Sequence, residues 1–236
     1  DLSQFGLKSG DTVLFRMTNS AEFAAAFLAC VWIGAVPVLQ NSQFGQSELA
    51  HIAGVSQPAL FLLAEDMRDD AATAGLMPEV PRKIIDDLSQ KPAPPPPAPF
   101  DATRDTRAFV VFTSGTTGKP KGVVHAHRWL EALGDSNRAR VPPQAGDVIL
   151  ATGEWSFISA LGHNMLFPLR NGTTGSIMED RAAPERILRT IERDCVTLLH
   201  SVATLFRRIL ATPGIEHQFD VRSEEHTSEL QSPYVI

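Results

Sequence analysis

The stretch VVFTSGTTGKPKG, from Val110 to Gly122, joins an apolar segment to a loop suited to anion binding. The valines and phenylalanine at its start favour a strand, which we place at residues 108–112. Glycines in the following loop let successive backbone N–H groups turn inward, and the serine and threonine hydroxyls add neutral donors. Two lysines add positive charge. This combination predicts a binding site for a di- or triphosphate.

The predicted phosphate contacts follow the strand directly, and they are Thr113, Ser114, Gly115, Thr116, Thr117, Gly118 and Lys119. Lys121 is a further candidate, either for phosphate or for a structural role. The loop is not a Walker A motif, which needs four residues between its glycines and Ser or Thr after the lysine. Here two residues separate the glycines, and Pro120 follows the first lysine and disfavours a helix start there. The P-loop GTPase and kinase classes are therefore excluded.

Upstream of this stretch, apolar runs alternate with helical patterns. Strands are predicted at 11–17, 36–39, 59–63 and 83–85, and helices at 20–33 and 47–55. Downstream, strands are predicted at 148–152, 175–178 and 196–200, and helices at 127–134, 161–169, 184–193 and 203–210. Strands separated by helices indicate an α/β fold with mostly parallel sheets whose faces are flanked by helices.

The chain is predicted to have two folded parts, 1–90 and 101–221, and the phosphate-binding loop lies in the second. Between them lies KPAPPPPAPF, residues 91–100, in which proline prevents both helix and ladder formation. We interpret it as an extended connector, with an SH3-type ligand as the alternative. The last segment, RSEEHTSELQSPYVI at 222–236, reads like a translated sequencing adapter. It is expected to be non-native, with a natural solvated tail as the alternative.

Bulk properties narrow the function classes. The 236 residues carry a formal net charge of −6, which opposes binding to nucleic acid or to anionic membranes. The apolar run at 23–39 is short for a membrane span and contains Gly34 and Pro37, so a buried helix, turn and strand are predicted instead. Cys30 and Cys195 are predicted to be buried thiols in a reducing compartment, which indicates a cytoplasmic protein.

The motif TSGTTGKPKG resembles, residue for residue, the phosphate-binding motif of the AMP-binding (adenylate-forming) superfamily, which includes acyl-CoA synthetases, peptide-synthetase adenylation domains and luciferases. Further resemblance covers 6–38, 167–179 and 187–210, and in all nearly everything from Gly6 to about Val221. Within the family, VHAHR at 124–128 and the run LGHNMLFPLRNG look most similar to benzoate- and 2-aminobenzoate-CoA ligases.

The resemblance implies a fragment of the large domain of an acyl- or aryl-CoA synthetase. Such an enzyme uses ATP and Mg²⁺ to activate a carboxylic acid, here an aromatic one, as acyl-AMP, and then transfers it to CoA. Residues 113–119 would hold the β- and γ-phosphates, and Phe157 and Trp155 are expected near the acyl pocket, with core packing as the alternative for both.

The family's catalytic lysine belongs to a carboxy-terminal domain that the sequence does not contain. We therefore expect no catalytic residue and no protein metal ligand in this fragment, and no activity of the fragment itself. Two alternatives stay open: an adenylation domain of a peptide synthetase, and a non-catalytic nucleotide-binding module. The expected partner is a small carboxylic acid rather than nucleic acid or membrane, and the sequence does not indicate an oligomeric state.

Overall fold

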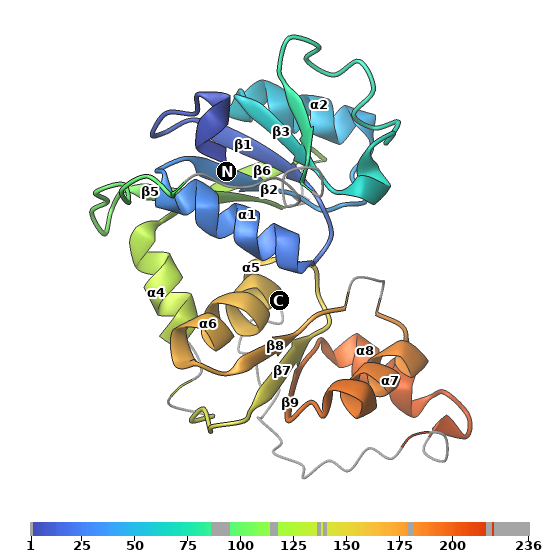
Figure 1. Cartoon of the computed structure of the whole chain (residues 1–236). Helices are drawn as coiled ribbons and strands as arrows, with labels where there is room; N and C mark the ends of the chain where they lie inside the picture. Colours follow the sequence, from blue (N-terminus) through green and yellow to red (C-terminus); the bar gives the residue numbers. More distant parts are fainter. Residues whose placement is uncertain are drawn as a thin grey trace.

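The structure, a computed structural model, describes residues 2–85, 95–113, 118–135, 138, 141–178, 182–215 and 219. The predicted loop residues 114–117, the start of the Pro-rich connector and the adapter-like segment 222–236 lie outside the described residues. Two sheets organise the described chain, one in the amino-terminal half and one in the carboxy-terminal half (Figure 1). The predicted α/β class with mostly parallel sheets is confirmed.

The larger sheet has six strands in the order β4-β3-β1-β2-β5-β6. Their bounds are β1 Thr12–Arg16, β2 Val36–Leu39, β3 Leu60–Leu63, β4 Arg82–Ile84, β5 Arg107–Thr113 and β6 Lys121–Ala126. All neighbouring pairs are parallel except β5 and β6, which are antiparallel. Both faces of the central strands are covered, which explains why β2 and β3 are uninterrupted apolar runs.

Helices cover the two faces of this sheet. Helix α1 (Ala21–Trp32) begins at Ser20, whose Oγ accepts a hydrogen bond from the N–H of Phe23 at 3.0 Å. It packs with alternate residues of β1, among them Val13 and Phe15, in one apolar cluster. Helix α2 (Gln46–Ser56) packs with the opposite residues in a second cluster, which contains Leu14. The period of two along β1 therefore divides the core into two layers.

The smaller sheet is wholly parallel, in the order β8-β7-β9. Its strands are β7 Val148–Ala151, β8 Thr174–Ser176 and β9 Leu198–His200, and its helices include α4 His127–Asp135, α6 Phe167–Asn171, α7 Pro184–Asp194 and α8 Ala203–Leu210. Between α4 and α6 lie α5 (Ile158–Ala160) and a π-helical turn, η3 (Leu161–Leu166). Short 3₁₀ turns, η1 (Leu2–Phe5) and η2 (Glu65–Met67), complete the elements.

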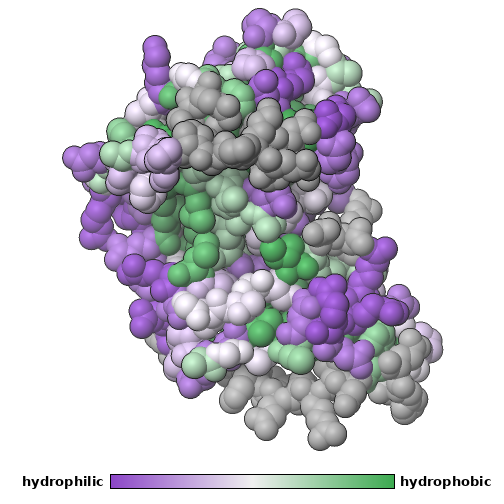
Figure 2. All heavy atoms as spheres, in the orientation of Figure 1, coloured by the Kyte–Doolittle hydropathy of each residue, from purple (hydrophilic) through white to green (hydrophobic). Residues whose placement is uncertain are grey.

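The first core cluster continues from the larger sheet into this second half. It contains Phe23 of α1 together with Trp155 and Leu161, whose segment precedes α6. The rings of Phe23 and Trp155 meet edge to face at 5.4 Å between centroids. In Figure 1, α1 lies between the six-stranded sheet and α5–α6, and Figure 2 shows apolar surface over this middle region. The two halves therefore share one core.

The polyproline segment packs against the end of α1. The indole Nε1 of Trp32 donates to the carbonyl of Pro97 at 2.8 Å, and the N–H of Phe100 donates to the carbonyl of Trp32 at 2.8 Å. Gly34, with φ of +77°, lies under the Phe100 ring, where a Cβ would approach to 2.6 Å. The connector does not coincide with the boundary between sheets, because β5 and β6 follow it and still pair with β2.

Three details of the sequence interpretation were wrong. Strand β6 was not predicted, and Lys121 and Gly122 belong to it rather than to the loop. Helix α2 begins at Gln46, with Gly45 as its N-cap, rather than at the predicted first residue, Ser47. Cys30 is buried as expected, but Cys195 is exposed because it is the left-handed C-cap residue that ends α7, with φ of +52°.

Within the described ranges, no helix has the length and apolar character of a membrane span.

Candidate active site

Five parallel strands of the six-stranded sheet, β4, β3, β1, β2 and β5, have their carboxyl ends at the same edge. Because β3, β1, β2 and β5 are adjacent and parallel, the segments that follow them emerge side by side. Ligands of open α/β sheets bind outside the carboxyl ends of the strands. The phosphate-binding loop predicted from the sequence follows β5 and therefore begins at this edge.

The described ends of that loop lie close together. Thr113 is the last residue of β5 and pairs with Lys121, the first residue of β6. Gly118 has φ of +93°, a conformation that favours glycine, and a Cβ there would meet nothing within 4 Å. Thr113, Gly118, Lys119 and Lys121 are all exposed, and no ion pair joins either lysine to another described residue. Both ammonium groups are therefore available at the mouth of the loop, whereas Ser114 to Thr117 lie outside the described residues.

A side chain that the sequence did not single out anchors the far end of the loop. Nε2 of His51, from α2, lies 3.0 Å from the carbonyl oxygen of Pro120. Pro120 is buried, although Lys119 beside it is exposed. A neutral or protonated imidazole can donate this hydrogen bond, which holds the backbone at the point where the loop enters β6. Helix α2 thus fixes the position from which Lys119 projects.

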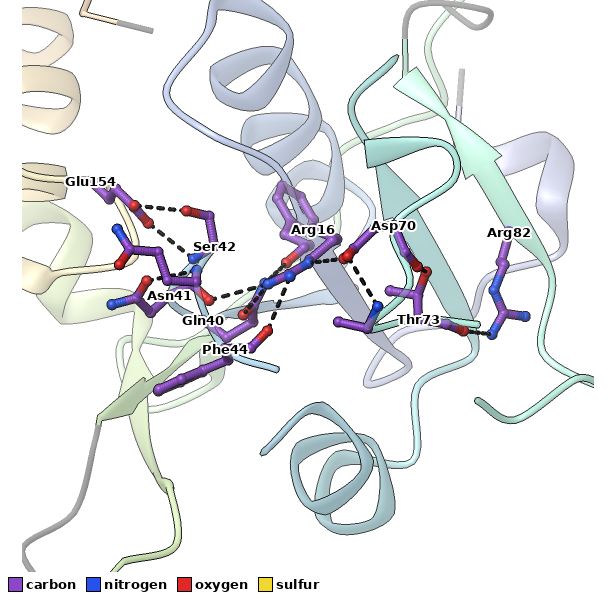
Figure 3. A network of polar contacts seen from close by, with 12 residues as sticks. Arg16, Gln40, Asn41, Ser42, Phe44, Asp70, Thr73, Arg82 and Glu154 are labelled. Carbon is purple, nitrogen blue, oxygen red and sulfur yellow. Dashed lines mark hydrogen bonds and ion pairs between the residues drawn. The ribbon is translucent and has the colours of Figure 1, made fainter. Parts of the chain in front are cut away.

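A buried arginine organises the neighbouring loops at the same edge (Figure 3). Arg16, the last residue of β1, is 3% exposed, and its Nε donates to a carboxylate oxygen of Asp70 at 2.6 Å. Its Nη1 donates to Oε1 of Gln40 and to the carbonyl of Asn41, and its Nη2 donates to the carbonyl of Phe44. A buried charge persists only when it is paired and hydrogen-bonded. The network therefore fixes the segment after β2 against the segment after β3.

Two side chains join this edge to the second half of the chain. The Asn19 amide donates to the carbonyl of Gly153 at 2.9 Å and accepts from the N–H of Trp155 at 2.7 Å. The Glu154 carboxylate accepts from the N–H of Ser42 at 3.1 Å and from its hydroxyl at 2.7 Å (Figure 3). Asn19 follows β1 and Ser42 follows β2, so these four hydrogen bonds join the segment after β7 to the ends of β1 and β2, at the sheet edge where the loop begins.

A pocket of about 580 Å³ opens next to this junction. It is lined by Ala151, Thr152, Gly153, Phe157, Ser159, Ala160, His163, Ala182, His200, Ser201, Val202, Thr204, Leu205 and Arg208. Phe157 is half exposed and contributes an aromatic wall. Trp155 is 2% exposed, donates from Nε1 to Oδ1 of Asn164 at 3.0 Å and does not line the pocket. Of the two aromatic candidates, only Phe157 therefore retains a predicted role in the pocket wall.

Two histidines form the polar part of the pocket wall. The rings of His163 and His200 are stacked, with centroids 4.2 Å apart and planes within 4° of parallel. Burial lowers the pKa of His200 to about 4, and the charge of His163 adds to this effect. Burial also lowers the pKa of His163, although a hydrogen bond with Ser159 acts in the opposite direction. Both imidazoles are therefore neutral near pH 7.

Among the residues that the structure describes, no group of three or more His, Cys, Asp or Glu side chains could hold a metal ion. The chemical resources of the site are thus two lysines, backbone N–H groups, hydroxyls, a neutral histidine pair and an apolar pocket. This combination suits binding of an anion next to an aromatic or aliphatic group.

Sequence reasoning missed the residues that position the site. His51, Asn19 and Glu154 act on partners that are 69, 134 and 112 residues away, so no local pattern marks them. His163 and His200 lie 37 positions apart in the numbering and meet only because η3 and β9 converge on the pocket. A weak signal existed for His163, since it interrupts an otherwise apolar helical run.

Comparisons with known proteins agree with this geometry. The family model described as AMP-binding enzyme matches residues 2–232. The chain is 29% identical to a 3-hydroxybenzoate–CoA/4-hydroxybenzoate–CoA ligase of Thauera aromatica, over 89% of the chain and 42% of the relative. It is 30% identical to a 3-hydroxybenzoate–CoA ligase of Aromatoleum sp. (strain CIB), over 87% of the chain and 41% of the relative.

A solved structure shares the fold. The benzoate CoA ligase from Burkholderia xenovorans LB400 superposes with a TM-score of 0.81 at 21% identity, over 94% of the chain and 46% of that protein. The chain therefore spans less than half the length of each of these three proteins.

Proposed function

The chain belongs to the AMP-binding enzyme family, and from that premise we propose that it supplies the pyrophosphate-binding loop and the acid pocket of an aryl-CoA ligase. In the first half-reaction, a carboxylate oxygen attacks the α-phosphorus of ATP, the bond to the β-phosphate oxygen breaks, and pyrophosphate leaves. The CoA thiol then displaces AMP from the acyl-adenylate, which gives the thioester and releases the thiol proton.

The loop between β5 and β6 carries the proposal. Its exposed ends, Thr113 and Gly118–Lys119, lie at the carboxyl edge of the sheet, and Lys121 lies opposite Thr113. Positive charge and N–H donors at this edge suit the β- and γ-phosphates, whose negative charge grows as pyrophosphate departs. Residues Ser114, Gly115, Thr116 and Thr117 belong to the same proposal through their motif.

The pocket supports an acid with a flat ring. Its lining is mainly apolar, with Phe157 and the two imidazoles as aromatic surfaces, and aromatic groups favour stacked or edge-on contact with one another. The hydrogen bonds of Asn19 and Glu154 tie the segment that contributes Gly153 to the pocket wall to the ends of β1 and β2, at the sheet edge where the loop begins. We propose Mg²⁺ only as part of the ATP complex, because no described cluster of side chains would hold it.

Pyrophosphate binding to the 236-residue chain, measured by calorimetry, tests the proposal. Lys119→Ala removes a charge-assisted contact and should weaken binding about tenfold. Lys8→Ala is the matched control, because Lys8 is exposed and precedes β1, at the opposite edge of the sheet. The proposed role of the loop is refuted if the wild-type chain does not bind pyrophosphate. It is also refuted if Lys119→Ala and Lys8→Ala lose the same amount of pyrophosphate affinity.

A further inference from the structure

The stacked histidine pair is set apart from the rest of the pocket wall by its chemistry. His163 belongs to the π-helical turn η3, a rare conformation that often occurs at functional sites. His200 ends β9, where its carbonyl accepts a hydrogen bond from the N–H of Thr152. The stack occupies one face of each ring and leaves the ring edges, which carry the nitrogens, for other contacts.

The hydrogen-bonding capacity of the pair is largely unused inside the protein. A neutral imidazole has one N–H donor and one acceptor nitrogen. Nδ1 of His163 lies 3.3 Å from the hydroxyl of Ser159, whereas the His200 ring makes no hydrogen bond to any described residue. Neither ring has a nitrogen that is sealed from solvent without a partner, and both residues line the pocket.

Other polar groups of the wall have less to offer a ligand. The hydroxyls of Thr152 and Ser201 bond to each other at 2.7 Å. Arg208 is exposed and lies on α8, so it contributes charge from a solvated position. The remaining lining consists of the hydroxyl residues Ser159 and Thr204 together with Gly153, Phe157, alanines, a valine and a leucine. Within the described lining, the histidine pair therefore offers two uncharged rings whose nitrogens can donate or accept hydrogen bonds.

We propose that His163 and His200 determine specificity by binding a hydroxyl or amino substituent on the ring of the acid. The inference rests on the proposed function, because it assumes that this pocket receives the aromatic acid. A hydroxyl or amino group can donate to one ring nitrogen and accept from another, which a bare ring cannot do. A site with buried polar groups discriminates against an analogue that leaves those groups unpaired.

An aryl acid with a neutral ring substituent should also bind more tightly than an aryl acid with a second carboxylate. Two imidazoles held neutral by burial offer no net charge, so they pair with neutral groups rather than with a second carboxylate. The substrate class is thus hydroxy- or amino-substituted aryl carboxylic acids. Unsubstituted and dicarboxylic aryl acids should bind more weakly, each by about tenfold, as the loss of one hydrogen bond predicts.

Calorimetric or NMR titration of the 236-residue chain with 3-hydroxybenzoate, 3-aminobenzoate, benzoate and isophthalate provides the test. His200→Phe and His163→Phe each keep a flat ring in the stack and remove its nitrogens, so either variant should bring the affinities for the hydroxyl and amino acids down to that of the same variant for benzoate. His127→Phe makes the same substitution at a histidine that does not line the pocket and should retain the preference. Thermal melts confirm that each protein is folded, and the two pocket variants test the pair independently.

The possible outcomes distinguish failure of the histidine pair's role from failure of the proposed aryl-acid pocket. If benzoate binds as tightly as its hydroxyl and amino derivatives, or the preference survives both substitutions, the role of the pair is overturned while the aryl pocket stands. Tighter binding of isophthalate would assign specificity to Arg208 and likewise overturn the role of the pair. If no aryl acid binds at all, the pocket's place in the proposed function fails as well.

Discussion

The unusual environment of His200 makes the stability of the chain depend on pH in a predictable way. Burial and the nearby His163 lower the pKa of the folded His200 from 6.5 to about 4. Between these values, the unfolded chain binds a proton that the folded chain excludes, so stability falls as the pH decreases through this range. At about 1.4 kcal/mol per pKa unit, His200 accounts for roughly 3 kcal/mol over the whole window and roughly 2 kcal/mol by pH 5.

His200→Phe isolates this contribution, because phenylalanine preserves the stacked ring and cannot be protonated. The free energy of unfolding is measured by urea denaturation at pH 7.5 and pH 5.0 for both proteins. The wild-type chain should lose about 2 kcal/mol more than the variant between the two values, since all other titrating groups are shared. Equal losses would refute the reasoning, and an NMR titration that places the His200 pKa near 6.5 would show where it failed.

Three further changes in stability follow from single contacts, each measured by chemical denaturation. Asp70→Ala removes the carboxylate partner of the Arg16 guanidinium, which is 3% exposed, and should lower the free energy of unfolding by roughly 3 kcal/mol. A loss below 1 kcal/mol would mean that the backbone carbonyls around Arg16 are enough to stabilise its buried charge. Gly175→Ala places a Cβ 2.4 Å from the Asn164 carbonyl oxygen and should cost about 2 kcal/mol, whereas an unchanged midpoint would show that η3 can move aside. Ser20→Ala removes the N-cap hydroxyl of α1 and should cost about 1 kcal/mol, with Ser20→Thr restoring most of the loss.

The sequence predicted those elements whose residues carry their own signal. Strands β2 and β3 are continuous apolar runs, and α1 has its cap and its apolar face in one segment, so local pattern was enough. Strand β6 escaped prediction because four of its six residues are exposed and its second residue is a glycine. Its conformation comes from pairing with β5, a tertiary effect that overrides local propensity. The exposure of Cys195 likewise follows from how α7 ends rather than from the residue itself.

The candidate site shows the same division between local and long-range information. The phosphate-binding motif could be recognised because its chemistry lies within ten consecutive residues, 113–122. The pocket could not be derived in that way, since its wall combines residues from 151 to 208. Phe157 was predicted from its place before the FPL segment, but His163 and His200 acquire meaning only through their stacking.

The distance between loop and pocket matters more than either feature alone. Adenylation requires a carboxylate to reach the α-phosphorus, and small errors in such placement reduce rates steeply. The side-chain amide of Asn19 holds the segment after β7 with two hydrogen bonds. Its nitrogen donates to the Gly153 carbonyl, and its oxygen accepts from the Trp155 N–H. A carboxylate at this position would lack the donor and would repel the carbonyl. The Asn19 amide therefore fixes the segment after β7, which includes Gly153 of the pocket wall, against the end of β1, while the shared core holds the two halves together.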